Sequence, residues 1–242
     1  MSESFSIPPN AVRVWRGYRD SKVAQDDFFA KLGTVFVPAT VKMQIAVGLQ
    51  SYIPAVPCGL PNKPDVVPDE TAVLFWDSQD AYTDGFKTLA VRTYTLTHKP
   101  VYRSPSGADF PILFTGQLST EKPVYLIDKP MDWMHAPVRH LVGARPGTKT
   151  PDQFRATVAN ALGTIQKSGI GAAIACTGDD YLVYWEVGSV RGGTDALEAL
   201  LGWSKKVEMI PTTIDAGLWN VWPGMTINPG DGFNMQFERR WE

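Results

Sequence analysis

The feature that most constrains the fold of this chain is an internal repeat. The stretch VRVWRGYR at 12–19 and the stretch VRHLVGAR at 138–145 share Val, Arg, Gly and Arg in the same order. The match continues at the same offset of about 126 residues, where Asp26, Phe28 and Ala30 correspond to Asp152, Phe154 and Ala156. A repeat of this length can contain a whole supersecondary unit, so we expect two copies of one unit.

A second echo follows in each half. AVLFWDS at 72–78 resembles YLVYWEV at 181–187, which aligns Trp76-Asp77 with Trp185-Glu186. The smaller offset indicates a longer connection in the first copy, and PCGLPNKPDVVPDE at 57–70 supplies it as a Pro-rich loop. We therefore expect a first repeat over 1–130 and a second over 131–242, together in one compact pseudo-symmetric unit.

Both halves have the same expected order of elements. In the first, we expect strands at 12–19, 48–56 and 71–77, helices at 21–34 and from Pro38, a long helix at 79–98, and a closing strand from ILFTGQL or VYLID. In the second, we expect a strand at 138–145, a helix capped by Thr150 with Pro151 at its first position, and a hairpin turning at 178–180. A helix capped by Thr194 and a closing strand from VEMIP or GLWNVWP complete it.

The order strand, helix, strand, strand, helix, strand predicts an α+β fold of two ferredoxin-like units. Helices cover one face of each antiparallel sheet, and the two sheets can cover each other's second face. In this the chain resembles the dimeric α+β-barrel superfamily, in particular its tandem members with two fused units. The resemblance implies no single activity, because that superfamily includes haem enzymes, cofactor-free monooxygenases, cyclases, lyases, isomerases and binding proteins.

Strand alternation divides the repeated residues between two faces. Arg13, Trp15, Gly17 and Arg19 share one face, and the more apolar face contains Val12 and Val14. We expect the apolar face to lie under the helices, which directs the Arg-Gly-Arg face toward the barrel interior. Arginines there are expected to hold a carboxylate or phosphate, and glycine leaves room for a ligand.

An architectural role for these arginines is the competing interpretation. Arg13 and Arg139 are expected to pair with Asp77 and Glu186, the acids that follow Trp76 and Trp185. The same two acids are candidate proton carriers, because burial against tryptophan raises the pKa of a carboxyl group. Trp76 and Trp185 are the candidate aromatic walls for a substrate.

The three histidines supply further candidates. His98 ends the long predicted helix and is close in sequence to Tyr102 and Arg103, so it is a candidate general acid or base, a haem ligand, or a helix cap. His140 is expected to be a hydrogen-bonded core residue, with axial haem ligation as the alternative. His135 and His140 have no evident third ligand, and we expect no metal site.

Composition and missing motifs exclude several classes of function. The chain has 242 residues with a formal net charge of −2, which gives no reason to expect nucleic acid or an anionic membrane as partner. GxGxxG, GxxxxGK[ST], GxSxG and HExxH are absent. Two distant cysteines, Cys58 and Cys176, and an N-terminus without a signal-peptide pattern suggest the cytoplasm.

The leading hypothesis is a cofactor-independent enzyme of the lyase, isomerase or cyclase type, acting on a small, partly hydrophobic substrate. His98, Asp77 or Glu186 would move the proton, and Arg13, Arg19 or Arg103 would hold the developing anion. A haem enzyme is the second hypothesis. The third is a non-catalytic module for a small molecule or a protein, which predicts an exposed apolar edge and no enclosed cavity. A homo-oligomer is compatible with all three, because edge strands of such sheets can pair between chains.

Overall fold

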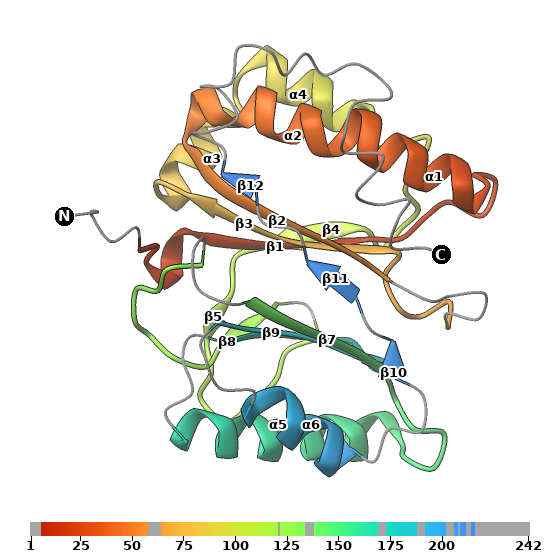
Figure 1. Ribbon diagram of the computed structural model, residues 1–242, viewed down its shortest axis with the longest axis vertical. Coiled ribbons are helices and arrows are strands. Elements are labelled where there is room, and N and C mark those ends of the chain that lie inside the picture. Colours follow the sequence, from red (N-terminus) through yellow and green to blue (C-terminus); the bar gives the residue numbers. More distant parts are fainter. Residues whose placement is uncertain are drawn as a thin grey trace.

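The computed structural model describes residues 6–57, 64–120, 122–133, 138–168, 173–187 and 192–201, and the backbone of short strands at 206–207, 209–211 and 214–215. These residues form two sheets that face each other, with helices on the outer side of each sheet (Figure 1). Their strand pairs are antiparallel, apart from one parallel pair at an edge. The chain is therefore an α+β protein with four layers in the order helix, sheet, sheet, helix.

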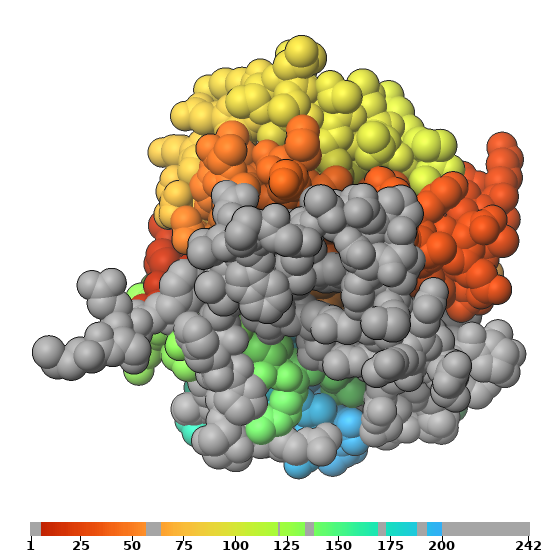
Figure 2. Space-filling model, turned by 45° about the horizontal axis from the view of Figure 1, so that its top comes forward, coloured from red at the N-terminus to blue at the C-terminus, as the bar shows by residue number. Residues whose placement is uncertain are grey.

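The elements of the first half follow the predicted order. They are β1 (Val12–Gly17), α1 (Gln25–Lys31), a π-helical turn η2 (Leu32–Phe36), α2 (Val37–Gln44), β2 (Leu49–Pro57), β3 (Glu70–Trp76), α3 (Gln79–Gly85), α4 (Leu89–Leu96) and β4 (Gly107–Asp109). Figure 2 shows the surface of α1 and α2, in orange, beside that of α3 and α4, in yellow to lime. The helices thus form one layer over the first sheet.

The second half repeats this order. Its elements are β7 (Val138–Ala144), α5 (Pro151–Lys167), β8 (Ala173–Thr177), β9 (Tyr181–Val187), α6 (Gly192–Leu201) and β10 (Lys206–Val207). The spatial order is β2-β3-β1-β4 in the first sheet and β8-β9-β7-β10 in the second, so corresponding strands hold corresponding places. The duplication read from the repeat is therefore visible in the order of the strands.

Each half also adds a segment to the sheet of the other. β5 (Ile112–Leu113) and β6 (Val124–Tyr125) extend the second sheet beyond β8, while β11 (Met209–Pro211) and β12 (Ile214–Asp215) pair with β2 of the first. The prediction that ILFTGQL or VYLID closes the first unit is wrong, because β4 does so. VEMIP supplies part of both β10 and β11, and GLWNVWP lies outside the described residues, as do His135 and 58–63 of the Pro-rich loop.

Two helix predictions are corrected by local capping. The single helix expected at 79–98 is divided into α3 and α4, because Ser78 and Thr88 each accept a hydrogen bond from the first turn that follows them. The expected helix at 21–34 begins at Gln25 and continues through η2 into α2, where Pro38 occupies the first turn as predicted. The first sheet is consequently covered by several short helices.

Of the two helix caps predicted in the second half, the cap of α5 is confirmed and the cap of α6 is wrong. Thr150 caps α5, with Pro151 at the first position and Gln153 completing a capping box. The hairpin of β8 and β9 turns where it was predicted. The cap predicted at Thr194 is wrong, because α6 begins two residues earlier and the Thr194 hydroxyl donates to the Glu186 carboxylate at 3.1 Å.

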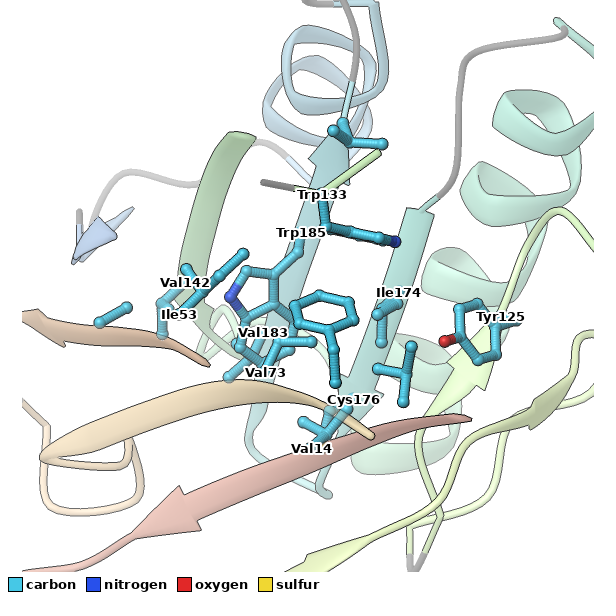
Figure 3. Close-up of a cluster of buried hydrophobic side chains, with 14 of the residues drawn as sticks. Val14, Ile53, Val73, Tyr125, Trp133, Val142, Ile174, Cys176, Val183 and Trp185 are labelled. Carbon is cyan, nitrogen blue, oxygen red and sulfur yellow. The ribbon is translucent and has the colours of Figure 1, made fainter. Parts of the chain in front are cut away.

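The prediction about strand faces is also wrong. The space between the sheets is filled by a buried apolar core, to which both sheets contribute β-branched side chains (Figure 3). Its members include Val12, Val14, Ile53 and Val73 from the first sheet, and Val142, Ile174, Val183 and Trp185 from the second. Arg13, Trp15 and Gly17 therefore point under the helices, away from the inter-sheet space.

Strand register explains why the second sequence echo misleads. Val12 pairs with Phe75, and its repeat partner Val138 pairs with Val187. Trp185 consequently occupies the position of Val73, three residues from the position that the echo assigns to it. Because three is an odd number, Trp76 and Trp185 point to opposite faces of their sheets, the first under helices and the second into the inter-sheet core.

Candidate active site

A cavity of about 500 Å³ lies between the first sheet and the helices that cover it. The sheet contributes Arg13, Trp15, Tyr52, Glu70, Ala72 and Leu74, and the helical layer contributes Phe36, Thr40, Gln44, Tyr94, Thr95 and His98. Phe86 and residues of the segment 99–108 complete the lining. This volume is in the range of cavities that bind small organic molecules, and aromatic and aliphatic side chains form most of its wall.

Glu70 is the buried carboxylate of this cavity. It is the first residue of β3 and shares a face with Ala72 and Leu74, so strand alternation directs it under the helices. Its side chain is embedded among hydrogen-bond donors, and the residue is 2% exposed. Trp15 Nε1 donates to Oε2 at 3.0 Å, Tyr102 OH donates to the same oxygen at 2.7 Å, and Tyr52 OH donates to Oε1 at 3.3 Å.

These surroundings change the proton affinity of Glu70. Removal from water raises the pKa of its carboxyl group to about 7, although the hydrogen bonds from Tyr102, Trp15 and Tyr52 oppose the rise. The carboxylate in turn raises the pKa of Tyr102, after burial as the first cause, so the phenol stays a donor. Near neutral pH, Glu70 therefore exchanges a proton with small changes in free energy.

Gly17 is required for this arrangement. A Cβ atom at position 17 would lie 2.7 Å from Tyr102 Cε1, 2.9 Å from Trp15 Nε1 and 3.0 Å from Glu70 Oε2. Real side chains do not approach one another so closely, so any larger residue would displace the donors of Glu70. The glycine in the repeated motif thus leaves room for a carboxylate and its donors in the first half.

His98 packs against Tyr102, whose hydroxyl donates to Glu70. Its ring stacks on Tyr102 with centroids 5.3 Å apart, and its Nδ1 lies 3.3 Å from the Tyr94 carbonyl oxygen. Burial lowers the pKa of His98, so the neutral ring is favoured at pH 7. A neutral ring whose Nδ1 donates to a carbonyl keeps Nε2 as an acceptor, which makes His98 a second proton acceptor in the cavity wall.

Three cations line the cavity at different depths. Arg13 is packed against the faces of Tyr82 and Phe86, with its guanidinium carbon 4.0 Å and 5.7 Å from their ring centroids. Lys99 is exposed at the rim, and Arg103 donates to the Asp65 and Ser104 carbonyl oxygens. Together they give the cavity a positive charge, with Glu70 as the single acid among its lining residues.

Four of the predicted site residues line this cavity: His98, Arg13, Tyr102 and Arg103. The other five lie outside its lining. Asp77 is exposed beyond the end of β3 and accepts a hydrogen bond from Gln50 Nε2 at 2.6 Å. Arg19 donates to the Val23 carbonyl oxygen, and Trp76 packs against Tyr82.

Glu186 and Trp185 belong to the other half. Glu186 is buried under α6, where Tyr184 OH donates to it at 3.0 Å and Arg139 Nη1 lies at 3.6 Å. A Cβ atom at Gly193 would lie 2.2 Å from Glu186 Oε2, so the helix packs directly on the carboxylate. The expected Arg139–Glu186 pair is present, whereas Arg13 contacts Ala108 and two aromatic rings and does not pair with Asp77. The structure does not bring Asp77, Glu186 and His98 together, so they cannot act on one substrate.

The surroundings of the two described histidines do not fit haem ligation. His140 lies between the sheets with Nε2 3.1 Å from Thr71 Oγ1 and its ring against Trp185, so Nε2 is already engaged by a hydrogen bond. The predicted role of a hydrogen-bonded core residue is confirmed. The His98 ring is surrounded by Trp15, Phe36, Tyr94 and Tyr102 at centroid distances of 4.7–5.7 Å. The imidazole is therefore packed among four aromatic side chains.

Among the described residues, no group of three His, Cys, Asp or Glu side chains could hold a metal ion. None of the helices in the described ranges has the length and apolarity that crossing a bilayer requires.

Glu70 is the candidate site residue that the sequence did not predict. One signal was available: a single acid at the start of the apolar strand ETAVLFW, spaced to share a face with Ala72 and Leu74. The acids that follow the two tryptophans form a more conspicuous symmetric pair in the sequence. The donors of Glu70 come from β1, β2 and the segment after α4, and only the tertiary structure brings them together.

Comparison with known proteins gives structural similarity alone. No protein-family model and no curated protein sequence matches the chain. A candidate monooxygenase from Lactobacillus acidophilus aligns with 85% of this chain and 95% of its own, at 10% identity and a TM-score of 0.38. An anthrone oxidase-like protein aligns with 88% and 97%, at 9% identity and a TM-score of 0.43. A candidate monooxygenase from Fusobacterium nucleatum aligns with 87% and 95%, at 9% identity and a TM-score of 0.39. At this level of similarity no function is transferred from them.

Proposed function

We propose that this chain is a small-molecule enzyme that moves a proton on a partly hydrophobic substrate, with Glu70 as the group that accepts and returns the proton. One observation supports this most directly: a buried carboxyl group with a pKa raised to about 7 lines a cavity of about 500 Å³. A carboxyl group tuned to neutrality by burial is the arrangement by which enzymes run acid and base chemistry at pH 7.

The proton transfer follows from the contacts of Glu70. In its ionised form it accepts a proton from an acidic C–H or O–H group of a substrate, and the electron pair of that bond stays on the substrate as an enolate or phenolate. Tyr102, Trp15 and Tyr52 hold the carboxylate in place by donating to both of its oxygens. Protonated Glu70 then returns the proton to another atom of the same substrate, or to a leaving group.

This sequence of steps corresponds to lyase, isomerase or cyclase chemistry and uses no added oxidant or reductant. His98 is a second acceptor for a proton, because its Nδ1 is engaged by the Tyr94 carbonyl oxygen. Phe36, Ala72 and Leu74 give the substrate an apolar surface that excludes water. The cavity between the first sheet and its helices also weighs against the third hypothesis, a non-catalytic binding module, because that hypothesis predicts no enclosed cavity.

The strand order supports a finer description of the fold. We propose that each half is a ferredoxin-like unit, and that the chain is a fused form of the dimeric α+β barrel. The repeats would comprise 1–130 and 131–242. β5 and β6 of the first half lie in the second sheet, and β11 and β12 of the second half lie in the first sheet. This arrangement supports the description, because it joins the two halves along both sheets. Further association into a homo-oligomer stays a prediction.

The test measures proton exchange without requiring the natural substrate. 2-Tetralone, a small aromatic ketone with acidic C–H groups, is incubated in D₂O with the protein, and the loss of its α-proton signals is followed by NMR. We expect the wild-type protein to accelerate this exchange, and the Glu70→Gln variant to lose about 10²–10⁴-fold of the acceleration, the range for removal of a general base.

Asp77→Asn is the matched control, because it removes a carboxylate that lies outside the cavity, directly after the strand that begins with Glu70. It is expected to exchange at the wild-type rate. Circular dichroism and thermal melting establish that each variant is folded. Equal rates in wild type and Glu70→Gln, or no acceleration by wild type over matched buffer, would refute the proposal.

A further inference from the structure

Arg13 is a half-buried cation at the opposite end of the cavity from Glu70. It lies on β1 opposite Leu74, four residues before Gly17, which lies opposite Glu70. Four residues of strand span about 13 Å, so the two charged groups start from well separated backbone positions. The cavity between them is lined by Ala72 and Leu74 on the sheet side.

The charge of Arg13 is only partly compensated by the protein. Its Nη2 donates to the Ala108 carbonyl oxygen at 3.1 Å, and its guanidinium lies over the rings of Tyr82 and Phe86. The carboxylate of Asp109 interacts electrostatically with Arg13, but it is already paired with Arg16, whose Nη2 lies 2.5 Å from Asp109 Oδ2. Burial lowers the pKa of Arg13, which shows that its surroundings oppose the cation.

Two other partly buried arginines of this chain, Arg16 and Arg145, are each paired with a carboxylate. Arg16 contacts the Asp109 carboxylate, and Arg145 donates to Asp180 Oδ1 from Nε at 2.9 Å and from Nη2 at 2.7 Å. In the described part of the chain, Arg13 contacts a carbonyl oxygen and aromatic rings, and no carboxylate lies within 4.0 Å of it. A guanidinium in this position has donors left for an anion that enters the cavity.

We infer that Arg13 forms an anion subsite of the cavity and that the substrate is an aromatic carboxylic acid, with its carboxylate at Arg13 and its acidic C–H or O–H at Glu70. This inference deepens the proposed function, because it names the substrate class of the same cavity. The flat body of such an acid lies along Ala72 and Leu74, and its carboxylate takes the paired donors of the guanidinium.

Arg13 suits this role better than the two other cations of the cavity. Lys99 is exposed, so water already solvates its ammonium group. Arg103 donates to two carbonyl oxygens and packs over the Tyr18 ring. Arg13 is half-buried and donates to one carbonyl oxygen only, so more of its donors are left for a carboxylate. Charge-assisted hydrogen bonds also strengthen as the surroundings become less polar.

The experiment uses 6-hydroxy-2-naphthoate and its methyl ester, which differ in charge and little in shape. Binding of both is measured by isothermal titration calorimetry near pH 6, where the naphthoate is ionised and Glu70 mostly protonated. We expect the wild-type protein to bind the acid at least about tenfold more tightly than the ester. Arg13→Gln is expected to weaken the acid about 10–100-fold and the ester less than about threefold, as for loss of a charged hydrogen bond.

Two further variants control this comparison. Arg155→Gln removes the same charge from α5, far from the cavity, where Arg155 contacts Asp152 and Asp179, and it is expected to bind both compounds like the wild type. Arg13→Lys keeps the cation and is expected to keep the preference for the acid, so a folding defect in Arg13→Gln does not remove the test.

Equal affinity of the wild type for acid and ester, binding of neither, or an acid affinity unchanged in Arg13→Gln would overturn the inference. Failure of the proposed function is distinguishable, because it is read from proton exchange in Glu70→Gln and not from binding. Arg13-dependent binding of the acid without catalysed exchange would support the subsite and refute the proton transfer.

Discussion

Replacing Glu70 by Gln should flatten the dependence of the protein's stability on pH. Burial raises the pKa of Glu70 from 4.5 to about 7, so the folded state holds this proton more tightly than the unfolded chain. The stability that protonated Glu70 contributes is fully present below about pH 4.5 and is lost as the pH rises through about 7. The amide of the Glu70→Gln variant cannot titrate, so the variant lacks this loss.

The size of the effect follows from the two pKa values. Each tenfold change in proton affinity corresponds to about 1.4 kcal/mol, so the whole transition is worth about 3 kcal/mol. Part of it has already occurred at pH 5, because the unfolded carboxyl group titrates near 4.5. Between pH 5 and pH 8 we therefore expect a change of about 2–3 kcal/mol.

Urea unfolding of both proteins at pH 5 and at pH 8 measures this quantity. The free energy of unfolding of the wild type minus that of Glu70→Gln should be larger at pH 5 than at pH 8 by about 2–3 kcal/mol. Placing an amide beside the hydrogen-bond donors of Glu70 destabilises the variant by the same amount at both pH values, so this contribution cancels in the comparison. Asp77→Asn, which removes an exposed carboxyl group, should show a difference below about 0.5 kcal/mol. If the Glu70→Gln difference is equally small, Glu70 does not have the raised pKa on which the proposed mechanism depends.

Four further measurements test the packing around the site and the core and the access of a porphyrin to the cavity. Gly17→Ala should destabilise the protein by about 1–3 kcal/mol, because its Cβ meets Tyr102, Trp15 and Glu70. Gly163→Ala on α5, where a Cβ meets nothing within 4 Å, should stabilise it by about 0.5–1 kcal/mol, and equal effects would contradict the packing. Trp185→Ala should cost about 3–5 kcal/mol in thermal or urea unfolding, whereas an effect below about 1 kcal/mol would mean that the inter-sheet core is not close-packed. Titration with haemin should give no Soret shift; a sharp shifted band lost in His98→Ala would show that the cavity opens enough for a porphyrin.

Local sequence signals predicted most of the elements. Thr150, Pro151 and Gln153 lie within four consecutive positions, and their capping interactions depend on the backbone of one turn. The expected long helix at 79–98 was wrong for the same kind of reason, because Ser78 and Thr88 each start a helix of their own. The internal repeat predicted the common element order of the two halves.

The assignment of faces failed because alternation identifies two faces of a strand without saying what covers each. Val12 and Val14 are apolar whether they pack under helices or against a second sheet. The choice depends on how the two sheets meet, which is a contact between residues more than 100 positions apart. The echo of Trp76 and Trp185 failed similarly, since strand register is set by pairing with a neighbouring strand.

The candidate site was predicted in part. Arg13, His98, Tyr102 and Arg103 line one cavity, while Asp77 is exposed and Glu186 is sealed under α6. Residues that match between the copies proved to have different surroundings. Gly17 accommodates a carboxylate with its donors, and the first half alone supplies the tyrosines at positions 52 and 102 that hold it.

The sequence by itself determined the duplication, the strand and helix order and the Thr150 cap of α5, because these depend on periodicity and on neighbours within a few residues. Only the tertiary structure decided which face of β1 is buried between the sheets and which lines a cavity. It also decided that Glu70 is the site's carboxyl group, since a pKa near 7 is the balance of burial, which raises it, and of hydrogen bonds from Trp15, Tyr52 and Tyr102, which lower it. Proton affinity is a property of that assembled environment, and no short stretch of sequence encodes it.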